Sequence, residues 1–465
     1  METPSRTPIF SSSLQSFLSG RSLLKTEMPF SDQMMKTHLD GGYMEAGPGI
    51  FRSKNRWRCL RCNNDTQRLF ASFPCAVCKK TCVYCRNCIM MGRVATCTPL
   101  YRWTGPEPGW KDTVSLEWDG HLSAGQKAAS EAVQDAVTNG EDLLIWAVCG
   151  AGKTEVLFGG IELALKCGKR TCIATPRTDV VLELVPRLQK VFPSITVAAL
   201  YGGSEDRDVF SPLTISTTHQ LMRFEDAFDV VIVDEVDAFP YSFDRSLQWA
   251  VEKSAKKHAA RIYLTATPSK HWQDECRYGK RNYIKIPARF HRKPLPVPQF
   301  AWCGNWRKSL EKGKLPRGVS GWTQKRVAAG KQALIFLPHI QLMEKSLPLF
   351  QQLHPAIQAV HAEDSSRKEK VKAMRKGEIP ILLTTTILER GVTFPNIDVA
   401  IVGAEDDIFT EAALVQIAGR VGRSPEYPGG AVTFFHHGRT KAMIRALVHI
   451  AGMNNEARKA GLIDE

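Results

Sequence analysis

Ten short apolar segments, each of five or six residues, alternate with segments of helical character and form two sets along the chain. Apolar strands separated by helices are typical of parallel sheets that are covered on both faces. Because the two sets are separated near residue 290, the pattern predicts an α/β protein with two lobes. The expected strands lie at 143–148, 171–175, 213–217, 229–234 and 261–265, and then at 333–337, 357–361, 380–384, 398–402 and 431–435.

The N-terminal part has a different organisation. A chain of 465 residues is long enough for about three domains. One short amphipathic helix is expected around residues 14–24, and the stretch at 101–120, which contains Trp, Pro and Gly, is expected to be a linker. The predicted division is an N-terminal extension at 1–50, a cysteine-rich module at 51–100, a first lobe at 101–285 and a second lobe at 286–465.

The composition is that of an ordinary globular protein, with 43% apolar and 23% charged residues, which excludes a disordered tail, a collagen-like fibre and a small disulfide scaffold. The longest unbroken apolar run, Leu143 to Cys149, has seven residues, whereas a membrane-spanning helix needs about 20. The N-terminal residues lack the apolar core of a signal peptide. We therefore expect a cytoplasmic protein, which is still able to dock on a membrane protein.

Charge is distributed unevenly along the chain. The net charge is +15, of which residues 1–110 carry +8, residues 111–280 carry −5 and residues 281–465 carry +12. Two basic segments that flank an acidic one indicate that the outer parts bind a polyanion, and nucleic acid is the expected one.

Aromatic rings are interleaved with cations in both basic segments. Residues 281–326 hold twelve Lys and Arg with a single acid, and this pattern predicts a stacking platform for a nucleic-acid strand, the alternative being an interlobe linker with solvated charges. Within 51–100 the same pattern is consistent with the binding of a nucleic-acid strand, or with a purely structural cysteine-rich module whose rings pack its small core. The rings at 281–326 include Phe290, Phe300, Trp302, Trp306 and Trp322.

Eight of the thirteen cysteines lie between residues 59 and 97. In a reducing cytosol, dense Cys-x-x-Cys spacing indicates a metal site, and four thiolates suit Zn²⁺. The expected ligands are Cys59, Cys62, Cys85 and Cys88, and the 22 residues between the two knuckles are long enough for a hairpin across the site. Two alternatives stay open: Cys75/Cys78 as the second knuckle, or two zinc ions that use all eight thiols.

The strand at 143–148 runs into Gly150-Ala151-Gly152-Lys153-Thr154 and then into a predicted helix. Glycines let backbone amides surround a phosphate, and the helix N-terminus adds positive potential. Lys153 is expected to reach the β- and γ-phosphates, and Thr154 to hold Mg²⁺. Ala147 stands where the first glycine of the usual pattern would be. The segment predicts an ATP site.

Catalytic side chains are expected at two further places. Asp234 and Glu235 follow the strand at 229–234, where a carboxylate coordinates Mg²⁺ and its neighbour orients the attacking water. Arg420 and Arg423, spaced one helical turn apart in the second lobe, are expected to point the same way and to neutralise the γ-phosphate across the cleft.

In their order along about 300 residues, these segments resemble the motor of superfamily-two helicases. The resemblance implies two RecA-like lobes with ATP between them, Gln126 as the residue that reads adenine, and a strand-contact role for motif Ia and for the motif that follows it, here labelled Ic. The matching residues are Lys153 and Thr154 (motif I), Thr175-Pro176-Arg177 (Ia), Thr217 to Gln220 (Ic), Asp234, Glu235 and Asp237 (II), Thr265 to Thr267 (III), Thr384 to Thr386 with Glu389 to Val392 (V), and Gln416, Arg420 and Arg423 (VI).

A narrower resemblance extends from about residue 20 to the end. LIWAVCGAGKTE, DEVDAFPYS, RFHRKPLP and TTTILERGVTFP are similar to segments of the ComFA family, late-competence ATPases of Gram-positive bacteria. This implies a translocase of single-stranded DNA at the inner face of a membrane uptake channel, a four-cysteine zinc site at the ligands expected above, a phosphoribosyltransferase-like partner and assembly of several copies. The additional Cys75, Cys78 and Cys82 depart from a simple four-cysteine module.

Two other functions stay open. A duplex-unwinding helicase of the replication-restart type also combines zinc-binding cysteines with this form of motif VI, but the sequence has no obvious duplex-splitting insertion. A zinc-dependent DNA-binding adaptor that uses ATP only as a switch would not need Glu235, Arg420 and Arg423 together. The sequence therefore favours the translocase.

Overall fold

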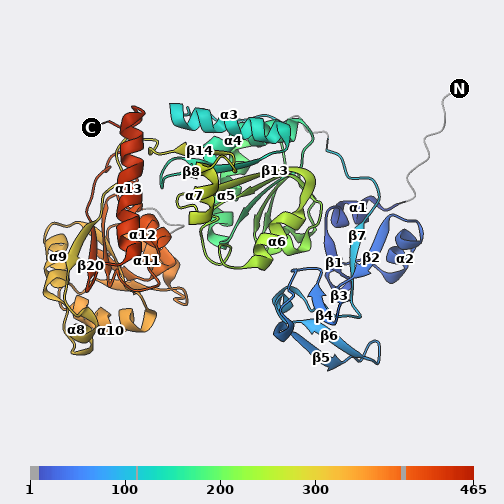
Figure 1. Ribbon diagram of the computed structural model, residues 1–465, viewed down its shortest axis with the longest axis horizontal. Coiled ribbons are helices and arrows are strands. Elements are labelled where there is room, and N and C mark those ends of the chain that lie inside the picture. The colour runs from blue at the N-terminus through green and yellow to red at the C-terminus, as the bar shows by residue number, and fades with distance from the viewer. Residues whose placement is uncertain (1–9, 111–113, 389–393, 465) are drawn as a thin grey trace.

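The computed structural model describes residues 10–110, 114–388 and 394–464. Three parts follow one another along the long axis of the molecule in Figure 1: a blue N-terminal unit, a green first lobe and an orange-to-red second lobe. No helix in the described part of the chain is long and apolar enough to cross a membrane.

The N-terminal unit contains a three-stranded antiparallel sheet in the order β1-β7-β2. The predicted helix at 14–24 is wrong in its second half, because the helix ends at Leu18, Gly20 takes a positive φ of 69° and a strand follows. The start of the expected linker is a strand, β7, which returns the chain from the cysteine-rich module to the N-terminal sheet. The elements are α1 (Ser12–Leu18), β1 (Ser22–Leu24), α2 (Asp32–Asp40), β2 (Met44–Pro48) and β7 (Pro99–Trp103).

Two hairpins lie between β2 and β7 and carry the clustered cysteines. Each is a pair of short antiparallel strands. The first joins β3 (Ile50–Ser53) to β4 (Arg56–Cys59), and the second joins β5 (Phe70–Pro74) to β6 (Thr81–Cys85).

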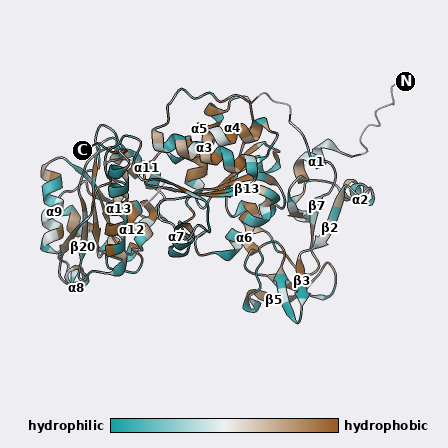
Figure 2. Cartoon of the chain, turned by 45° about the horizontal axis from the view of Figure 1, so that its top comes forward, coloured by the Kyte–Doolittle hydropathy of each residue, from teal (hydrophilic) through white to brown (hydrophobic). Residues whose placement is uncertain are grey.

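The first lobe is a seven-stranded parallel sheet in the order β10-β11-β9-β12-β13-β8-β14. Successive residues of each strand point to opposite faces: Ile145 and Ile232 pack with α3, α4 and α5, whereas Leu144 and Val231 pack with α6. Figure 2 shows the hydrophobic strands of this sheet between the helices. The strands are β8 (Asp142–Ala147), β9 (Thr171–Thr175), β10 (Val197–Leu200), β11 (Leu213–Thr217), β12 (Phe228–Val233), β13 (Ala255–Thr265) and β14 (Tyr283–Ile286); the helices are α3 (Ala124–Asn139), α4 (Lys153–Lys166), α5 (Thr178–Val191), α6 (Arg245–Ser254) and α7 (Lys270–Arg277).

The second lobe is a six-stranded parallel sheet in the order β15-β20-β19-β16-β18-β17. Its core joins that of the first lobe, since one hydrophobic cluster includes Val148 on one side and Val415 and Val421 on the other. The strands are β15 (Gln299–Trp302), β16 (Gln332–Phe336), β17 (Gln358–Val360), β18 (Ile381–Thr384), β19 (Ile397–Val402) and β20 (Val432–His436); the helices are α8 (Trp306–Glu311), α9 (Arg317–Ala328), α10 (Ile340–Gln351), α11 (Arg367–Arg375), α12 (Glu411–Ala418) and α13 (Lys441–Lys459).

The predicted fold class is confirmed, with two parallel-sheet lobes after a cysteine-rich module. All ten predicted strands are present and their ends agree to within one residue, except that β13 begins six residues early. In the two lobes the prediction missed β10, β14 and β15, each of which is an edge strand of only four residues.

Candidate nucleotide site and zinc module

The phosphate loop lies between β8 and the N-terminus of α4. Gly150 and Gly152 have φ angles of +84° and +70°, which only glycine adopts at little cost. A Cβ on Gly152 would lie 2.3 Å from the side-chain nitrogen of Gln126, so a larger residue here would displace Gln126 as well as strain the backbone. Lys153 and Thr154 occupy the first turn of α4, with their backbone amides at the positive end of the helix.

Gln126 supports this loop from α3. Its Oε1 accepts a hydrogen bond from the Ser123 amide at 2.8 Å, and its Nε2 donates one to the carbonyl of Ala151 at 2.9 Å. The side chain is buried, and its hydrogen bond to Ala151 fixes it to the loop backbone. The adenine contact of Gln126 stays a prediction.

The acidic motif follows β12, the strand next to β9 and β13 in the sheet. The Glu235 amide donates to Asp234 Oδ1 at 2.8 Å, and Glu235 itself has a positive φ of 54°. Three residues after Asp234, the Asp237 carboxylate accepts from the Thr267 hydroxyl at 2.5 Å. The predicted motif II and motif III therefore touch each other at the carboxyl ends of two adjacent strands.

Motif VI brings the second lobe to this site. Gln416, near the end of α12, accepts a hydrogen bond from the Cys149 thiol at 3.0 Å, and its Nε2 lies 3.5 Å from Asp237 Oδ2. One side chain of the second lobe thus contacts both Cys149, directly before Gly150 of the phosphate loop, and the acidic motif.

The two predicted arginines lie beyond the end of α12, not on one helical turn, because the helix ends at Ala418 and Gly422 has a positive φ. Arg420 is buried, and this burial, together with the charge of Arg423, lowers its pKa well below the ordinary value, whereas Glu235 acts in the opposite direction. Arg423 is half-buried and donates to the carbonyl of Gly419 at 3.0 Å. The expectation that both stand on one helical turn is therefore wrong.

Arg289 is a further residue of this interface, to which the sequence assigned no separate role, although it lies in the basic segment at 281–326 and begins RFHRKPLP. It is buried, and its guanidinium donates to the carbonyls of Cys149 (3.2 Å), Gly419 (3.3 Å) and Gly422. Burial lowers the pKa of Arg289 to about 10, so it is still charged at neutral pH. It joins the phosphate loop to the turn that carries Arg420 and Arg423. This role depends on carbonyls distant in the sequence, so its place in RFHRKPLP does not reveal it.

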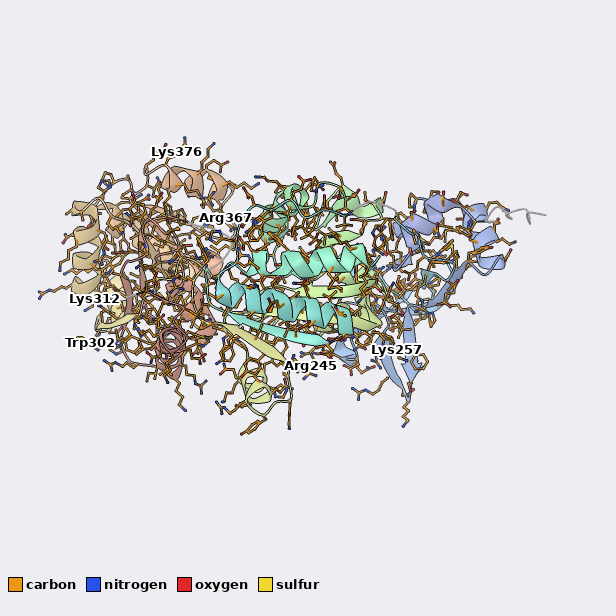
Figure 3. The ribbon with its side chains drawn as sticks, turned by 90° about the horizontal axis from the view of Figure 1, so that it is seen from above. Arg245, Lys257, Trp302, Lys312, Arg367 and Lys376 are labelled. Atoms are coloured by element: carbon orange, nitrogen blue, oxygen red, sulfur yellow. The ribbon has the colours of Figure 1, made fainter. Side chains whose placement is uncertain are left out.

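Two of the five rings of the predicted stacking platform at 281–326 are buried, so the platform is wrong for these two. Trp306 and Trp322 belong to the core of the second lobe, with exposed fractions of 1% and 8%. Trp302 is exposed, but Figure 3 shows it with Lys312 at the end of the second lobe, far from the first lobe. Phe290 is half exposed and is the ring of this segment that lies beside the lobe interface.

The two lobes also meet on the side of motif Ia. Arg177 is ion-paired with Asp179 and donates to the carbonyl of Ile387 at 3.4 Å, and Arg367 lies 3.6 Å from Asp179. Figure 3 shows Arg367 on the side of the second lobe that faces the first. The motif V residues Glu389 to Val392 lie outside the described residues.

The four predicted zinc ligands meet beside β4 and β6. Their thiols are buried and lie within 4.8 Å of one another, with 3.8 Å between Cys59 and Cys88 and 3.7 Å between Cys62 and Cys85. A tetrahedral zinc site with Zn–S bonds of about 2.3 Å has S–S edges of about 3.8 Å. We call this set the inner cluster, and its geometry fits Zn²⁺. As the 22-residue spacing indicated, the β5–β6 hairpin lies between its two knuckles.

The remaining four cysteines form a second group, which we call the outer cluster: Cys75, Cys78, Cys82 and Cys97. The alternative that Cys75 and Cys78 complete the site of Cys59 and Cys62 is therefore wrong.

An ion-pair chain connects the inner cluster to motif Ic of the first lobe. Arg61, within the first knuckle, is fully buried and pairs with Glu27, whose other oxygen accepts from Arg223 at 2.7 Å. Arg223 in turn donates to the side-chain oxygen of Gln220 at 2.6 Å. Burial acts to raise the pKa of Glu27, but Arg61, the Leu24 amide and Arg223 outweigh it and the pKa is lowered.

Comparison with known proteins agrees with this architecture. The family model of the competence protein ComFA N-terminal domain matches residues 5–102, that of the type III restriction enzyme res subunit matches 119–270, and that of the helicase conserved C-terminal domain matches 320–425.

Two curated relatives match over most of their length. The chain is 51% identical to competence protein ComFA of Bacillus subtilis, over 98% of both chains. It is 38% identical to competence protein ComFA of Streptococcus pneumoniae, over 88% of this chain and 93% of the relative.

Solved structures share the fold of the two lobes. Mycobacterium smegmatis helicase Lhr bound to ssDNA and AMP-PNP matches with a TM-score of 0.52 at 19% identity, over 72% of this chain and 50% of the other. RecG bound to a three-way DNA junction matches with a TM-score of 0.51 at 17% identity, over 74% and 47%. At these identities the likeness concerns the fold alone.

Proposed function

Because the chain belongs to the ComFA family and carries helicase-type ATPase domains, we propose that it is an ATP-dependent translocase that moves along single-stranded DNA during the uptake of transforming DNA. The observation that carries the proposal is the contact of Gln416 with both Cys149 and Asp237. A site built from both lobes couples hydrolysis to their relative movement, because closure and reopening change the contacts made at the nucleotide.

The phosphate loop is suited to the triphosphate of ATP. The positive-φ glycines expose backbone amides, Lys153 supplies a cation for the β- and γ-phosphates, and Gln126 is expected to read adenine. Thr154 and Asp234 are the residues that would hold Mg²⁺, which supplies positive charge to the phosphates.

The hydrolytic step needs an oriented water and a charge that stabilises the transferred phosphoryl group. Glu235 is the residue that would orient the water, since it directly follows Asp234 at the end of β12. Arg420 and Arg423 would neutralise the γ-phosphate from the second lobe, and the buried Arg420 gains from an anion because burial opposes its charge.

The DNA-binding surface is proposed to include motifs Ia and Ic at the carboxyl ends of β9 and β11. These strands are adjacent, and the Thr218 amide donates to the carbonyl of Thr175 at 2.9 Å. Partial desolvation lowers the pKa of His219 and outweighs the opposite effect of Asp244, so its ring adds little charge for a phosphate at neutral pH. Arg177 is the cation of this surface, and phosphate contacts of this kind carry no sequence information.

The ComFA resemblance also supports a location and partners. We propose that the protein works in the cytoplasm at the inner face of the competence DNA-uptake channel, with a phosphoribosyltransferase-like competence protein as a partner and with several copies assembled together.

Release of streptavidin from biotinylated single-stranded DNA tests translocation. We expect ATP-dependent release from one labelled end, no release with Lys153→Ala, and no separation of a forked duplex. Separation of the fork would favour the duplex-unwinding helicase, and release from neither end despite active hydrolysis would contradict the translocase.

A further inference from the structure

The outer cluster lies at the end of the β5–β6 hairpin, where the turn between the strands carries Cys75 and Cys78. Cys82 is in β6, and Cys97 lies two residues before the start of β7. The four thiols lie within 4.8 Å of one another, with 3.7 Å between Cys75 and Cys97 and 3.2 Å between Cys78 and Cys82. We propose that these four cysteines bind a second zinc ion, distinct from that of the inner cluster.

The turn at Cys75 repeats the backbone geometry of the inner knuckle. In the inner knuckle, the Cys59 carbonyl accepts from the Asn63 amide at 2.9 Å, and the Cys59 amide donates to the carbonyl of Asn64 at 3.0 Å. In the outer knuckle, the Cys75 carbonyl accepts from the Lys79 amide and the Cys75 amide donates to the carbonyl of Lys80, both at 2.9 Å.

The two turns also share a residue in the left-handed region. Asn63 and Lys79, each directly after the second cysteine of its pair, have φ angles of +58° and +54°. A lysine has no local reason to adopt this conformation, which is uncommon for residues other than glycine and asparagine. The shared turn therefore points to a shared role, the presentation of two thiolates to one metal.

The other two ligands come from neighbouring strands. The segment at 94–97 runs antiparallel to β6: the Cys85 amide donates to the carbonyl of Val94 at 3.0 Å, and Tyr84 is bridged to Ala95. Continued by two residues, this register places Cys97 opposite Cys82, and side chains directly opposite each other lie on the same face.

One ion cannot serve both clusters. Cys82 and Cys85 belong to the same strand and are three residues apart, so their side chains point to opposite faces of the hairpin. The hairpin would thus be fixed by one zinc ion at each end, and the outer ion would tie its tip to the segment that enters β7, the central strand of the N-terminal sheet. For a region with so small a hydrophobic core, metal binding contributes directly to folding.

Metal content measured on the full-length protein tests the second site. Purified under reducing conditions and analysed by inductively coupled plasma mass spectrometry, the wild-type chain should contain two zinc ions, and Cys97→Ser and Cys78→Ser should each contain one. Cys167→Ser changes an exposed cysteine outside both clusters and should retain two. One zinc ion per wild-type chain, or iron in place of the second zinc, would overturn the proposal.

Cobalt substitution gives a second readout that does not depend on the yield of a variant. Wild-type protein reconstituted with Co²⁺ should show thiolate-to-cobalt absorption about twice as intense per chain as Cys97→Ser, since half of the thiolate ligands would be lost. Equal absorption per chain in the two proteins would contradict an ion at the outer cluster.

Discussion

The Cys149 thiol donates a hydrogen bond of 3.0 Å to the side-chain oxygen of Gln416. Cys149 is the residue before Gly150 in the phosphate loop, and Gln416 is part of α12 in the second lobe, so this bond crosses the lobe interface at the nucleotide site. The nitrogen of the same glutamine lies 3.5 Å from Asp237 Oδ2. Gln416 therefore contacts both the phosphate-loop side and the acidic motif of the first lobe, so a movement of either lobe changes these contacts.

Gln416→Ala removes both contacts and should lower kcat about tenfold, because one buried hydrogen-bonded link is worth about 1 kcal/mol or somewhat more. The KM for ATP should change little, since Gln416 contacts Cys149 and not the residues expected to bind the phosphates. Steady-state hydrolysis measures both constants. Gln352→Ala, an exposed glutamine at the end of α10, is the matched control. Unchanged kcat in Gln416→Ala would contradict the coupling role.

Glu235→Gln should lower kcat by about 10²-fold or more, because the amide cannot act as the base for the attacking water. ATP binding should be retained. Hydrolysis and the binding of a fluorescent ATP analogue are measured on the same preparation, with the exposed Glu131→Gln on α3 as control. If Glu235→Gln retained the DNA-import function in cells, the adaptor that uses ATP only as a switch would replace the translocase.

Arg289→Lys keeps the positive charge but cannot reach the carbonyls of Cys149, Gly419 and Gly422 together. We expect a lower kcat and a loss of stability of about 2–4 kcal/mol, since buried carbonyls are left without their donor. The neighbouring Arg292→Lys is the control, because Arg292 is exposed and paired with Asp464. Thermal unfolding together with ATP hydrolysis checks both effects, and equal behaviour of the two variants would refute the role of Arg289.

Glu27 should make the docking of the zinc module depend on pH. Its pKa is lowered in the folded protein, so the ionised form is favoured by folding, and its stabilising contribution is complete above the ordinary pKa of about 4.5 and is lost as the pH falls through the lower folded value. Wild type should exceed Glu27→Gln in denaturation midpoint at pH 7, and the difference should shrink below about pH 4.5. A difference that stays constant down to pH 3.5 would show that the Glu27 charge has no such role.

Much of the architecture could be predicted because its determinants are local. Strands that are buried on both faces, such as β9 and β12, need continuous apolar runs, and the phosphate loop needs glycines at the end of such a strand. The inner zinc ligands come as two Cys-x-x-Cys pairs and could be chosen from their spacing.

Features that depend on tertiary packing could not be predicted. The role of Arg289 depends on carbonyls 130 or more residues away. The burial of Trp306 and Trp322 depends on the β-sheet of the second lobe, and the partnership of Cys97 with Cys82 depends on strand register. The positions of Arg420 and Arg423 differ from the prediction because Gly419 and Gly422 end the helix that the motif spacing suggested.

ATP hydrolysis by the purified protein, alone and with single-stranded DNA, duplex DNA or RNA, tests the central claim most directly. We expect single-stranded DNA to stimulate ATP hydrolysis strongly and Lys153→Ala to abolish it. Lys166→Ala, which changes an exposed lysine on the same helix, should hydrolyse ATP like the wild type. Hydrolysis that is indifferent to every nucleic acid, in a protein that still loses turnover with Lys153→Ala, would contradict a DNA-driven motor.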